Sequence, residues 1–317
     1  MKVLVTGCSG RLGGALVGAL LSHPLVRGVA GSDVRPPSRA EGDRFRYFPA
    51  DIRDGVYLRN VMEESEIDVV YHLAFKSGED ADPLDAATVN VDGPLAVLEA
   101  AHKARRVRKL VLLSSAYAYG AKRRNPPRLS EERRLEARGN GPAAWRRRME
   151  ESVSRMLPDL RQDLQVSFLR ACAIAGGGDE SACPALPFLR SPWGSLTPAL
   201  ADPQLQFLAL EEAVQAMVRI LEVSDFRGPY NLAPEDGVPL GTLCRRLGAP
   251  RLRLPYPLLW LLAGAARRLR PRLGLSAGAA AYLLHGVAVD NRRIKQALGI
   301  ELRTRSEDAF AGAYCRQ

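Results

Sequence analysis

Three glycines near the start of the chain have a spacing that could hold a phosphate. They stand at intervals of three residues in the segment Thr6-Gly7-Cys8-Ser9-Gly10-Arg11-Leu12-Gly13, directly after the apolar run Val3 to Val5. In such a turn the first glycine permits a tight bend, the second lets the backbone approach a diphosphate, and the third lets helix and strand pack closely. The anion then lies on the N-terminus of the following helix. The spacing predicts a site for a dinucleotide cofactor.

Two carboxylates follow the next strands expected along the chain. Asp33 ends the second strand, where it can accept hydrogen bonds from an adenosine ribose diol and would repel a 2′-phosphate. We therefore expect NAD, with NADP as the alternative because Arg11 and Arg35 could hold a 2′-phosphate; Asp33 could instead be a loop carboxylate paired with Arg35. Asp51 either faces the adenine amine or caps the helix that begins nearby.

The elements that must position these residues alternate along the first half of the chain. Apolar runs typical of strands lie at 3–6, 26–32, 68–73, 109–114 and 165–170, and helix-period segments lie at 11–22, 54–64, 83–104 and 142–158. Such alternation is typical of a parallel sheet with helices on both faces. The sequence predicts an α/β fold with a doubly wound, Rossmann-type parallel sheet.

The pattern changes after residue 170. Residues 171–203 contain a glycine run and five prolines, whereas 205–208, 210–221 and 228–232 again resemble strand, helix and strand returning to the sheet. Helices are expected near 239–247, 257–269, 276–286 and 291–298. We therefore expect a dinucleotide-binding domain over 1–170, which segments near 204–232 rejoin. A smaller, interleaved substrate lobe would consist of 171–203 and 233–317.

Composition argues against several other classes of protein. The net charge is +10, but the basic residues are spread over nearly every segment, so we expect no nucleic-acid partner. Five widely spaced cysteines without a Cys-x-x-Cys pair favour free thiols and a cytoplasmic location. A strand directly after Lys2 leaves no room for a signal peptide. The longest later apolar stretch, 257–266, is too short to span a membrane, although 255–272 could rest on anionic lipid or cover the substrate pocket.

Further short motifs follow one another along the chain, and their order is informative. They are His72-Leu73-Ala74, Asn90-Val91-Asp92-Gly93, the run from Leu113 through Ser114-Ser115 to Gly120, and Arg170 followed by Gly176. With the glycine turn, Asp33 and Asp51, they resemble an extended short-chain dehydrogenase/reductase of the NAD-dependent epimerase/dehydratase group. The resemblance implies a bound NAD, a small-molecule substrate of which nucleotide sugars are the commonest kind, and a homodimer formed through 83–104 and 142–158. It implies a cofactor site made of Gly7, Ser9, Gly10, Arg11, Leu12, Gly13, Asp33, Asp51, Ile52, Leu73, Ala74 and Asn90.

The resemblance also implies a catalytic tyrosine and, four residues later on one helix, a lysine whose ammonium lowers the pKa of the phenol. Ser115 falls where the family's substrate-orienting serine belongs, although a strand-end serine bonded to backbone would give the same pattern. The tyrosine position holds Trp145 and the lysine position holds Met149. An indole does not ionise at accessible pH and a thioether carries no charge, so the base and its partner are both missing.

Two functions follow from this loss. One is an NAD(P)-binding protein that is weakly active or non-catalytic. The other is an active NAD-dependent oxidoreductase or epimerase for a nucleotide sugar or related alcohol, with a general base drawn from Tyr117, Tyr119, Glu150 or Glu151. The three arginines at 146–148 are expected to form a solvated helix face, and the alternative is that one of them points inward toward a phosphate.

Overall fold

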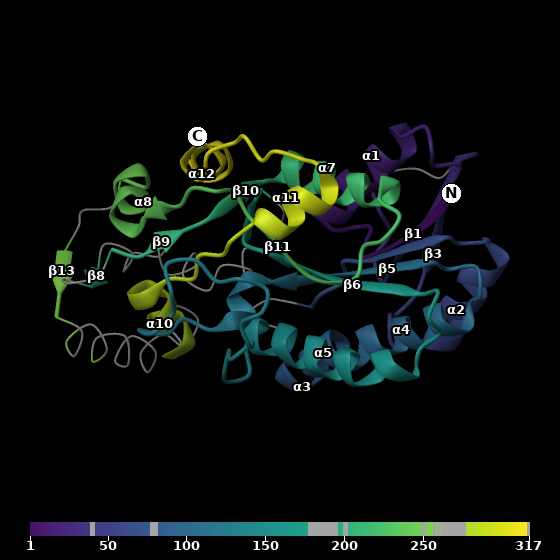
Figure 1. Ribbon diagram of the computed structural model, residues 1–317, viewed down its shortest axis with the longest axis horizontal. Coiled ribbons are helices and arrows are strands. Elements are labelled where there is room, and N and C mark those ends of the chain that lie inside the picture. The colour runs from purple at the N-terminus through teal and green to yellow at the C-terminus, as the bar shows by residue number, and fades with distance from the viewer. Residues whose placement is uncertain are drawn as a thin grey trace.

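Seven parallel strands form one sheet in the order β11-β6-β5-β4-β1-β2-β3 (Figure 1). The computed structural model describes residues 1–38, 42–76, 82–176, 196–198, 202–248, 252–255, 258, 261 and 277–315. The strands are β1 (Lys2–Thr6), β2 (Gly28–Asp33), β3 (Phe45–Pro49), β4 (Val69–His72), β5 (Lys109–Ser115), β6 (Gln165–Ala171) and β11 (Gly228–Leu232). The order reverses between β1 and β4, which is the topological switch point of a doubly wound sheet. The predicted fold class is confirmed.

Helices cover both faces of the sheet (Figure 1). The helices of the sheet domain are α1 (Arg11–Ser22), α2 (Gly55–Glu64), α3 (Pro83–Ala87), the π-helical turn η1 (Thr88–Asp92), α4 (Gly93–Lys103), α5 (Pro142–Met156) and α7 (Leu210–Arg219). Successive side chains of a strand point to opposite faces, so β1 serves two cores. Val3 and Val5 pack with residues of α1 and α7, whereas Leu4 packs with residues of α2, α4 and α5.

The small strands beyond residue 171 do not all return to the sheet. β7 (Ala173–Ala175) pairs with β10 (Phe207–Ala209), β9 (Gln204–Leu205) with β12 (Val238–Pro239), and β8 (Leu196–Pro198) with β13 (Leu252–Leu254). The strand character expected over 205–208 is present in β9 and β10, but the expectation that this strand returns to the main sheet is wrong, and of this segment only β11 joins it. Gln206 lies between β9 and β10, and its buried side-chain amide bonds the backbone of Pro234 and Val289.

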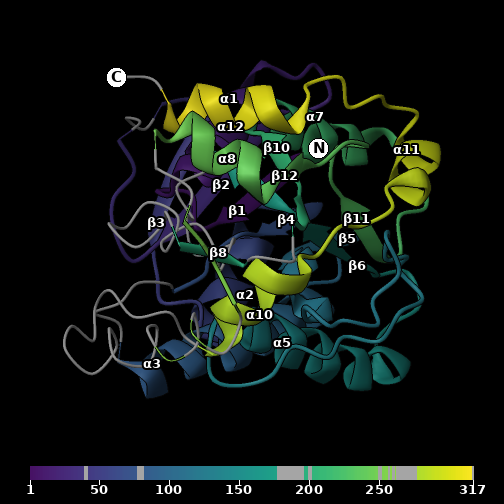
Figure 2. The same cartoon turned by 90° about the vertical axis from the view of Figure 1, so that its left-hand side faces the viewer.

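The last part of the chain is helical, as Figure 2 shows from the side. Its described helices are α8 (Leu240–Arg246), α10 (Ala277–His285), α11 (Arg292–Leu298) and α12 (Ser306–Tyr314). The first three were expected and α12 was not. The expected helix at 257–269 lies mostly outside the described residues, as does most of the 255–272 segment. Within the described ranges, no helix is long and apolar enough to span a membrane.

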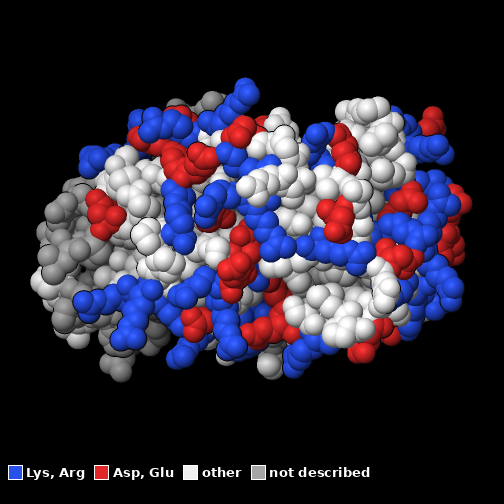
Figure 3. Space-filling view, viewed as in Figure 1, with Lys and Arg blue, Asp and Glu red and all other residues white. Residues whose placement is uncertain are grey.

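On the face shown in Figure 3, Lys and Arg side chains are interspersed with Asp and Glu. Among the described residues, Cys8, Cys172, Cys244 and Cys315 are not joined in disulfide bonds, and Cys183 lies outside those residues.

Candidate cofactor-binding cleft

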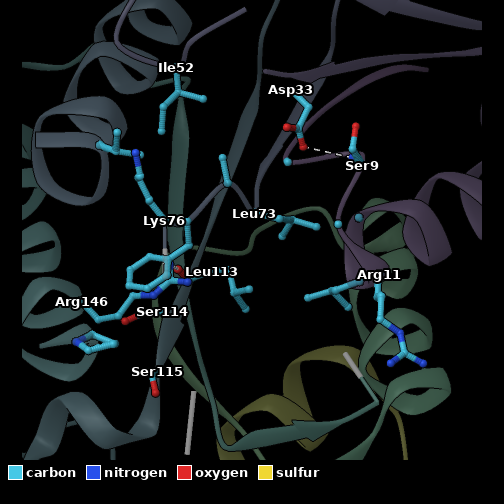
Figure 4. A pocket seen from close by; sticks show the side chains of 18 of the residues that line it. Ser9, Arg11, Asp33, Ile52, Leu73, Lys76, Leu113, Ser114, Ser115 and Arg146 are labelled. Atoms are coloured by element: carbon cyan, nitrogen blue, oxygen red, sulfur yellow. Dashed lines mark hydrogen bonds between the residues drawn. The ribbon is translucent and has the colours of Figure 1, made fainter. Parts of the chain in front are cut away.

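A cleft of about 680 Å³ opens at the carboxyl ends of the central strands, where the order of the sheet reverses. Such crevices bind ligands in open α/β sheets. Its lining comes from the turns after β1 to β6 and from the start of α5. Figure 4 shows Asp33 and Ser9 on one side, and Ser114, Ser115 and Arg146 at the opposite end. Of the twelve predicted cofactor residues, all except Asn90 line this cleft.

The glycine turn has the backbone that its spacing predicts. Gly7 has φ of +77°, a conformation that favours glycine, and its N–H donates to the carbonyl of Ser32 at 2.8 Å. A Cβ atom on Gly13 would lie 2.1 Å from the carbonyl oxygen of Gly7, so only glycine permits this packing. Gly10 is the N-cap of α1 and provides no capping side chain. The first N–H groups of α1 therefore face the cleft without a side-chain acceptor.

Asp33 is bonded to the turn that holds the glycines. Its carboxylate accepts the backbone N–H of Ser9 at 3.1 Å and that of Arg35 at 3.2 Å. The alternative expectation, a side-chain pair with Arg35, has no counterpart among the ion pairs of the described residues. The carboxylate thus stands at the end of β2, beside the diphosphate turn, where a ribose diol would lie.

Asp51 lines the cleft, and it does not cap α2. The capping residue is Asp54, whose carboxylate accepts the N–H of Tyr57 at 2.9 Å. Asp51 instead pairs with Arg53 at 2.6 Å, and hydrogen bonding to that guanidinium lowers the pKa of Asp51. Arg53 also binds Asp85 at 2.7 Å. These ion pairs tie the turn after β3 to the start of α3.

Asn90 is not among the described residues that line the cleft, and its expected contact with the cofactor stays a prediction. It is 2% exposed, and its side chain bonds both the N–H and the carbonyl of Lys76 at 2.8 Å. It therefore fixes the segment after β4, whose residues Leu73, Ala74, Phe75 and Lys76 line the cleft. Only a folded chain shows whether such an amide faces a ligand or a neighbouring loop.

Two serines end β5 at the cleft. The Ser115 hydroxyl accepts the N–H of Tyr117 at 3.2 Å, so this side chain both lines the cleft and satisfies backbone. The Ser114 hydroxyl donates to the carboxylate of Glu150. Glu150 is buried and forms a two-pronged ion pair with Arg170, with 2.8 Å between Nη2 and Oε2. A cleft hydroxyl is thereby coupled to a buried carboxylate.

Trp145 and Met149 do not line the cleft. Trp145 lies 6.4 Å from Phe75 between ring centroids, and Met149 is 1% exposed in the core beneath the sheet. The residues of α5 that line the cleft are Pro142, Ala143 and Arg146. Positions three or four apart share one side of a helix, so spacing alone could not decide which pair turns inward. The expectation that Trp145 and Met149 stand at the family's tyrosine and lysine positions stays a prediction, although neither residue lines the cleft.

Arg146 is not part of a solvated helix face, contrary to expectation. It is 6% exposed, donates to the carbonyl of Leu113, and its guanidinium carbon lies 3.8 Å from the centre of the Phe75 ring. Arg147 is partly exposed and pairs with Glu151 at 3.2 Å. Of the three consecutive arginines, the first is therefore held inside the cleft.

No tyrosine is among the described residues that line the cleft. Tyr119 donates to Asn231 at 2.9 Å and accepts from Arg170 at 2.8 Å, and burial raises its pKa to about 12. Tyr117 packs edge-on against Tyr282, whose hydroxyl donates to the Tyr117 carbonyl at 2.5 Å. Neither phenol is positioned as a base for a cleft ligand.

His72 is a packed histidine at the end of β4. It is fully buried, and its Nδ1 lies 2.7 Å from the Thr6 hydroxyl. Burial, together with the charge of Arg146, lowers its pKa to about 3. The ring is therefore neutral at physiological pH and contributes no charge beneath the cleft.

Arg35, which could hold a 2′-phosphate, lines the cleft, and fourteen further lining residues were not predicted from the sequence. They are Val34, Ala50, Arg53, Phe75, Lys76, Val89, Leu113, Ser114, Pro142, Ala143, Arg146, Ala171, Cys172 and Ile174. Phe75 and Lys76 directly follow the His72-Leu73-Ala74 motif, so continuation of that strand end could have identified them. Arg146 gave no such signal, because it stands among three consecutive arginines.

The fold and the cleft define a Rossmann-type dinucleotide-binding protein. A family model described as the NAD dependent epimerase/dehydratase family matches residues 3–233. The chain belongs to this family.

Relatives agree with this assignment. An uncharacterized protein of Mycobacterium tuberculosis is 29% identical over 322 aligned residues, covering 97% of this chain and 82% of that protein. The UDP-glucose 4-epimerase of Mycolicibacterium smegmatis is 40% identical over 126 residues, which is 36% of this chain and 39% of that enzyme.

Solved structures share the whole fold. The UDP-glucose 4-epimerase of Thermotoga maritima with UDP-glucose has a TM-score of 0.73 and 17% identity, covering 99% of this chain and 97% of that chain. The Bordetella bronchiseptica enzyme WbmG in complex with NAD and UDP has a TM-score of 0.72 and 17% identity, covering 98% and 92%.

Proposed function

We propose that this protein binds NAD in the cleft but lacks the phenol–ammonium pair of its family, and is therefore a weak oxidoreductase or a non-catalytic NAD-binding protein. The substrate class that suits such a cleft is a nucleotide sugar, since similar proteins are named for UDP-glucose or were solved with UDP.

The residues of the cleft fit a dinucleotide from end to end. The glycine turn and the uncapped start of α1 suit a diphosphate. A Cβ on Gly10 would meet nothing closer than the Gly7 carbonyl at 3.4 Å, so a longer side chain there would project into the cleft. Asp33 suits the adenosine ribose. By the reversal of strand order, the nicotinamide half would lie over the ends of β4, β5 and β6.

The proposed loss of catalytic power rests on one observation, which is the type of the residues on the side of α5 that lines the cleft. The i, i+4 pair that lines the cleft there is Pro142 and Arg146. Proline has no ionisable group, and a guanidinium stays protonated, so neither can accept a proton from a substrate hydroxyl. NAD supplies a hydride acceptor when bound. Losing general acid–base help typically costs a factor of ~10²–10⁴ in rate.

Binding is tested by titrating the full chain with NADH, followed by fluorescence, and with NAD, followed by calorimetry. We expect saturable binding that Gly10→Glu abolishes. Gly14→Glu is the matched control, because Gly14 is exposed on the same helix and outside the lining. Absence of binding by the unaltered protein would refute the proposal.

Catalysis is tested with UDP-glucose and UDP-glucuronic acid as probes. We expect turnover at least about 100-fold below that of the M. smegmatis UDP-glucose 4-epimerase assayed beside it. Turnover equal to that enzyme would show that an efficient proton relay is present.

One observation favours the second candidate, an active oxidoreductase or epimerase with a different base. The Ser114 hydroxyl lines the cleft and donates to buried Glu150, which gives a proton on a cleft ligand a path to a carboxylate. Substantial turnover that is lost in Ser114→Ala, with NAD affinity unchanged, would select this candidate.

A further inference from the structure

Arg146 places a fixed positive charge at one end of the cleft. Its guanidinium is held from two directions, by the Leu113 carbonyl at the end of β5 and by the Phe75 ring after β4. Both strands border the half of the cleft opposite Asp33 (Figure 4). A buried, planar group held in this way cannot swing into solvent as a flexible side chain can.

The charge of that group does not depend on pH, because arginine remains protonated in proteins. The family's tyrosine and lysine would combine a phenol that can ionise with an ammonium. In this cleft the described lining contains the Arg146 guanidinium but no tyrosine. The field of Arg146 extends into the interior, since its charge contributes to lowering the pKa of buried His72.

The two redox forms of the cofactor respond differently to a nearby cation. The nicotinamide ring is positively charged in NAD and neutral after it has gained a hydride. A fixed positive charge in a partly desolvated cleft repels the first form and leaves the second almost unaffected. A site that binds one form better shifts the equilibrium between them by the ratio of the two affinities.

We propose that Arg146 makes this cleft selective for NADH over NAD, so that its occupancy follows the reduction state of the nicotinamide pool. This inference rests on the proposed NAD site and names the form of the cofactor that it retains. It suits a protein without a proton relay, because sensing requires selective binding and no turnover. A tenfold preference corresponds to raising the potential of the bound two-electron couple by about 30 mV.

The test is the ratio of the dissociation constants of NAD and NADH, measured on the same preparation of the full chain. For the unaltered protein we expect NADH to bind about tenfold more tightly. Arg146→Gln should bring the ratio close to one, and Arg146→Lys should retain part of the preference. Arg147→Gln, a change of the same charge at the next position, should leave the ratio unchanged because Arg147 does not line the cleft.

ADP-ribose separates the effect on the ring from a general loss of binding. It has the adenosine, diphosphate and ribose but no nicotinamide, so its affinity should be similar in the unaltered protein and in Arg146→Gln. Equal affinities for NAD and NADH in the unaltered protein, or a ratio that survives Arg146→Gln, would overturn the inference while leaving the NAD site intact. Failure of both nucleotides to bind would refute the proposed function itself.

Discussion

The Asp33 carboxylate accepts the backbone N–H of Ser9 at 3.1 Å, which joins the end of β2 to the glycine turn after β1. Two segments separated by more than twenty residues are thus fixed where a ribose and a diphosphate would lie side by side. The bond also orients the carboxylate, whose second oxygen accepts the N–H of Arg35.

Asp33 should set the preference for NAD over NADP. Asp33→Asn keeps an oxygen that can accept from Ser9 but removes the charge that repels a 2′-phosphate. We expect NAD affinity to fall about tenfold and the discrimination against NADP to narrow, as charge-assisted bonds contribute about 1.5–3 kcal/mol. Calorimetric titration with both nucleotides measures this. Asp43→Asn, outside the cleft lining, is the control, and an unchanged NAD/NADP ratio in Asp33→Asn would exclude the role.

Two adjacent glycines of α1 should respond in opposite directions to the same substitution. Gly13→Ala puts a methyl group 2.1 Å from the Gly7 carbonyl, so we expect a loss of at least about 2 kcal/mol in the free energy of unfolding. Gly14→Ala meets only the Cys8 carbonyl at 3.6 Å, and should gain about 0.5–1 kcal/mol because alanine favours helix. Urea unfolding checks both, and equal stability of the two variants would contradict the packing described for the turn.

Introducing a tyrosine and a lysine on the side of α5 that lines the cleft tests whether this side holds the family's catalytic positions. Pro142→Tyr with Arg146→Lys should raise the rate of NAD reduction by UDP-glucose at least about tenfold, because general acid–base help is returned. Trp145→Tyr with Met149→Lys should not, and should destabilise the protein, because Met149 is 1% exposed in the core. A rate increase in the second double variant alone would show that positions 145 and 149 are the catalytic ones, as expected from the sequence.

His72 should make the protein sensitive to acid. Its pKa is about 3 in the folded state and 6.5 is usual, so between these values the unfolded chain binds one more proton. The free energy of unfolding should therefore fall as pH drops below about 6.5, by up to about 1.4 kcal/mol per pH unit from this residue. Urea unfolding between pH 4.5 and 7.5 should show a shallower slope for His72→Gln, and an identical slope would assign the acid sensitivity to other groups.

Local patterns were sufficient for most of the fold and for the diphosphate end of the cleft. The strand–helix alternation predicted the elements of the sheet domain, and the glycine spacing with Asp33 predicted one wall of the site. These features depend on backbone geometry within a few residues, so the sequence specifies them directly. The expected return of 205–208 to the main sheet was wrong, because β9 and β10 pair with β12 and β7, and such pairing depends on segments far apart in sequence.

By itself, the sequence determined the doubly wound fold, the diphosphate turn and the absence of a Tyr-x-x-x-Lys motif, since each depends on residue type and spacing along the chain. Only the tertiary structure decided that the Asn90 side chain bonds the backbone of Lys76, and that Arg146, not Met149, faces the cleft. The direction of a side chain on a helix is fixed by what packs against each of its sides. That information lies in contacts between segments far apart in sequence, here Phe75, Leu113 and α5.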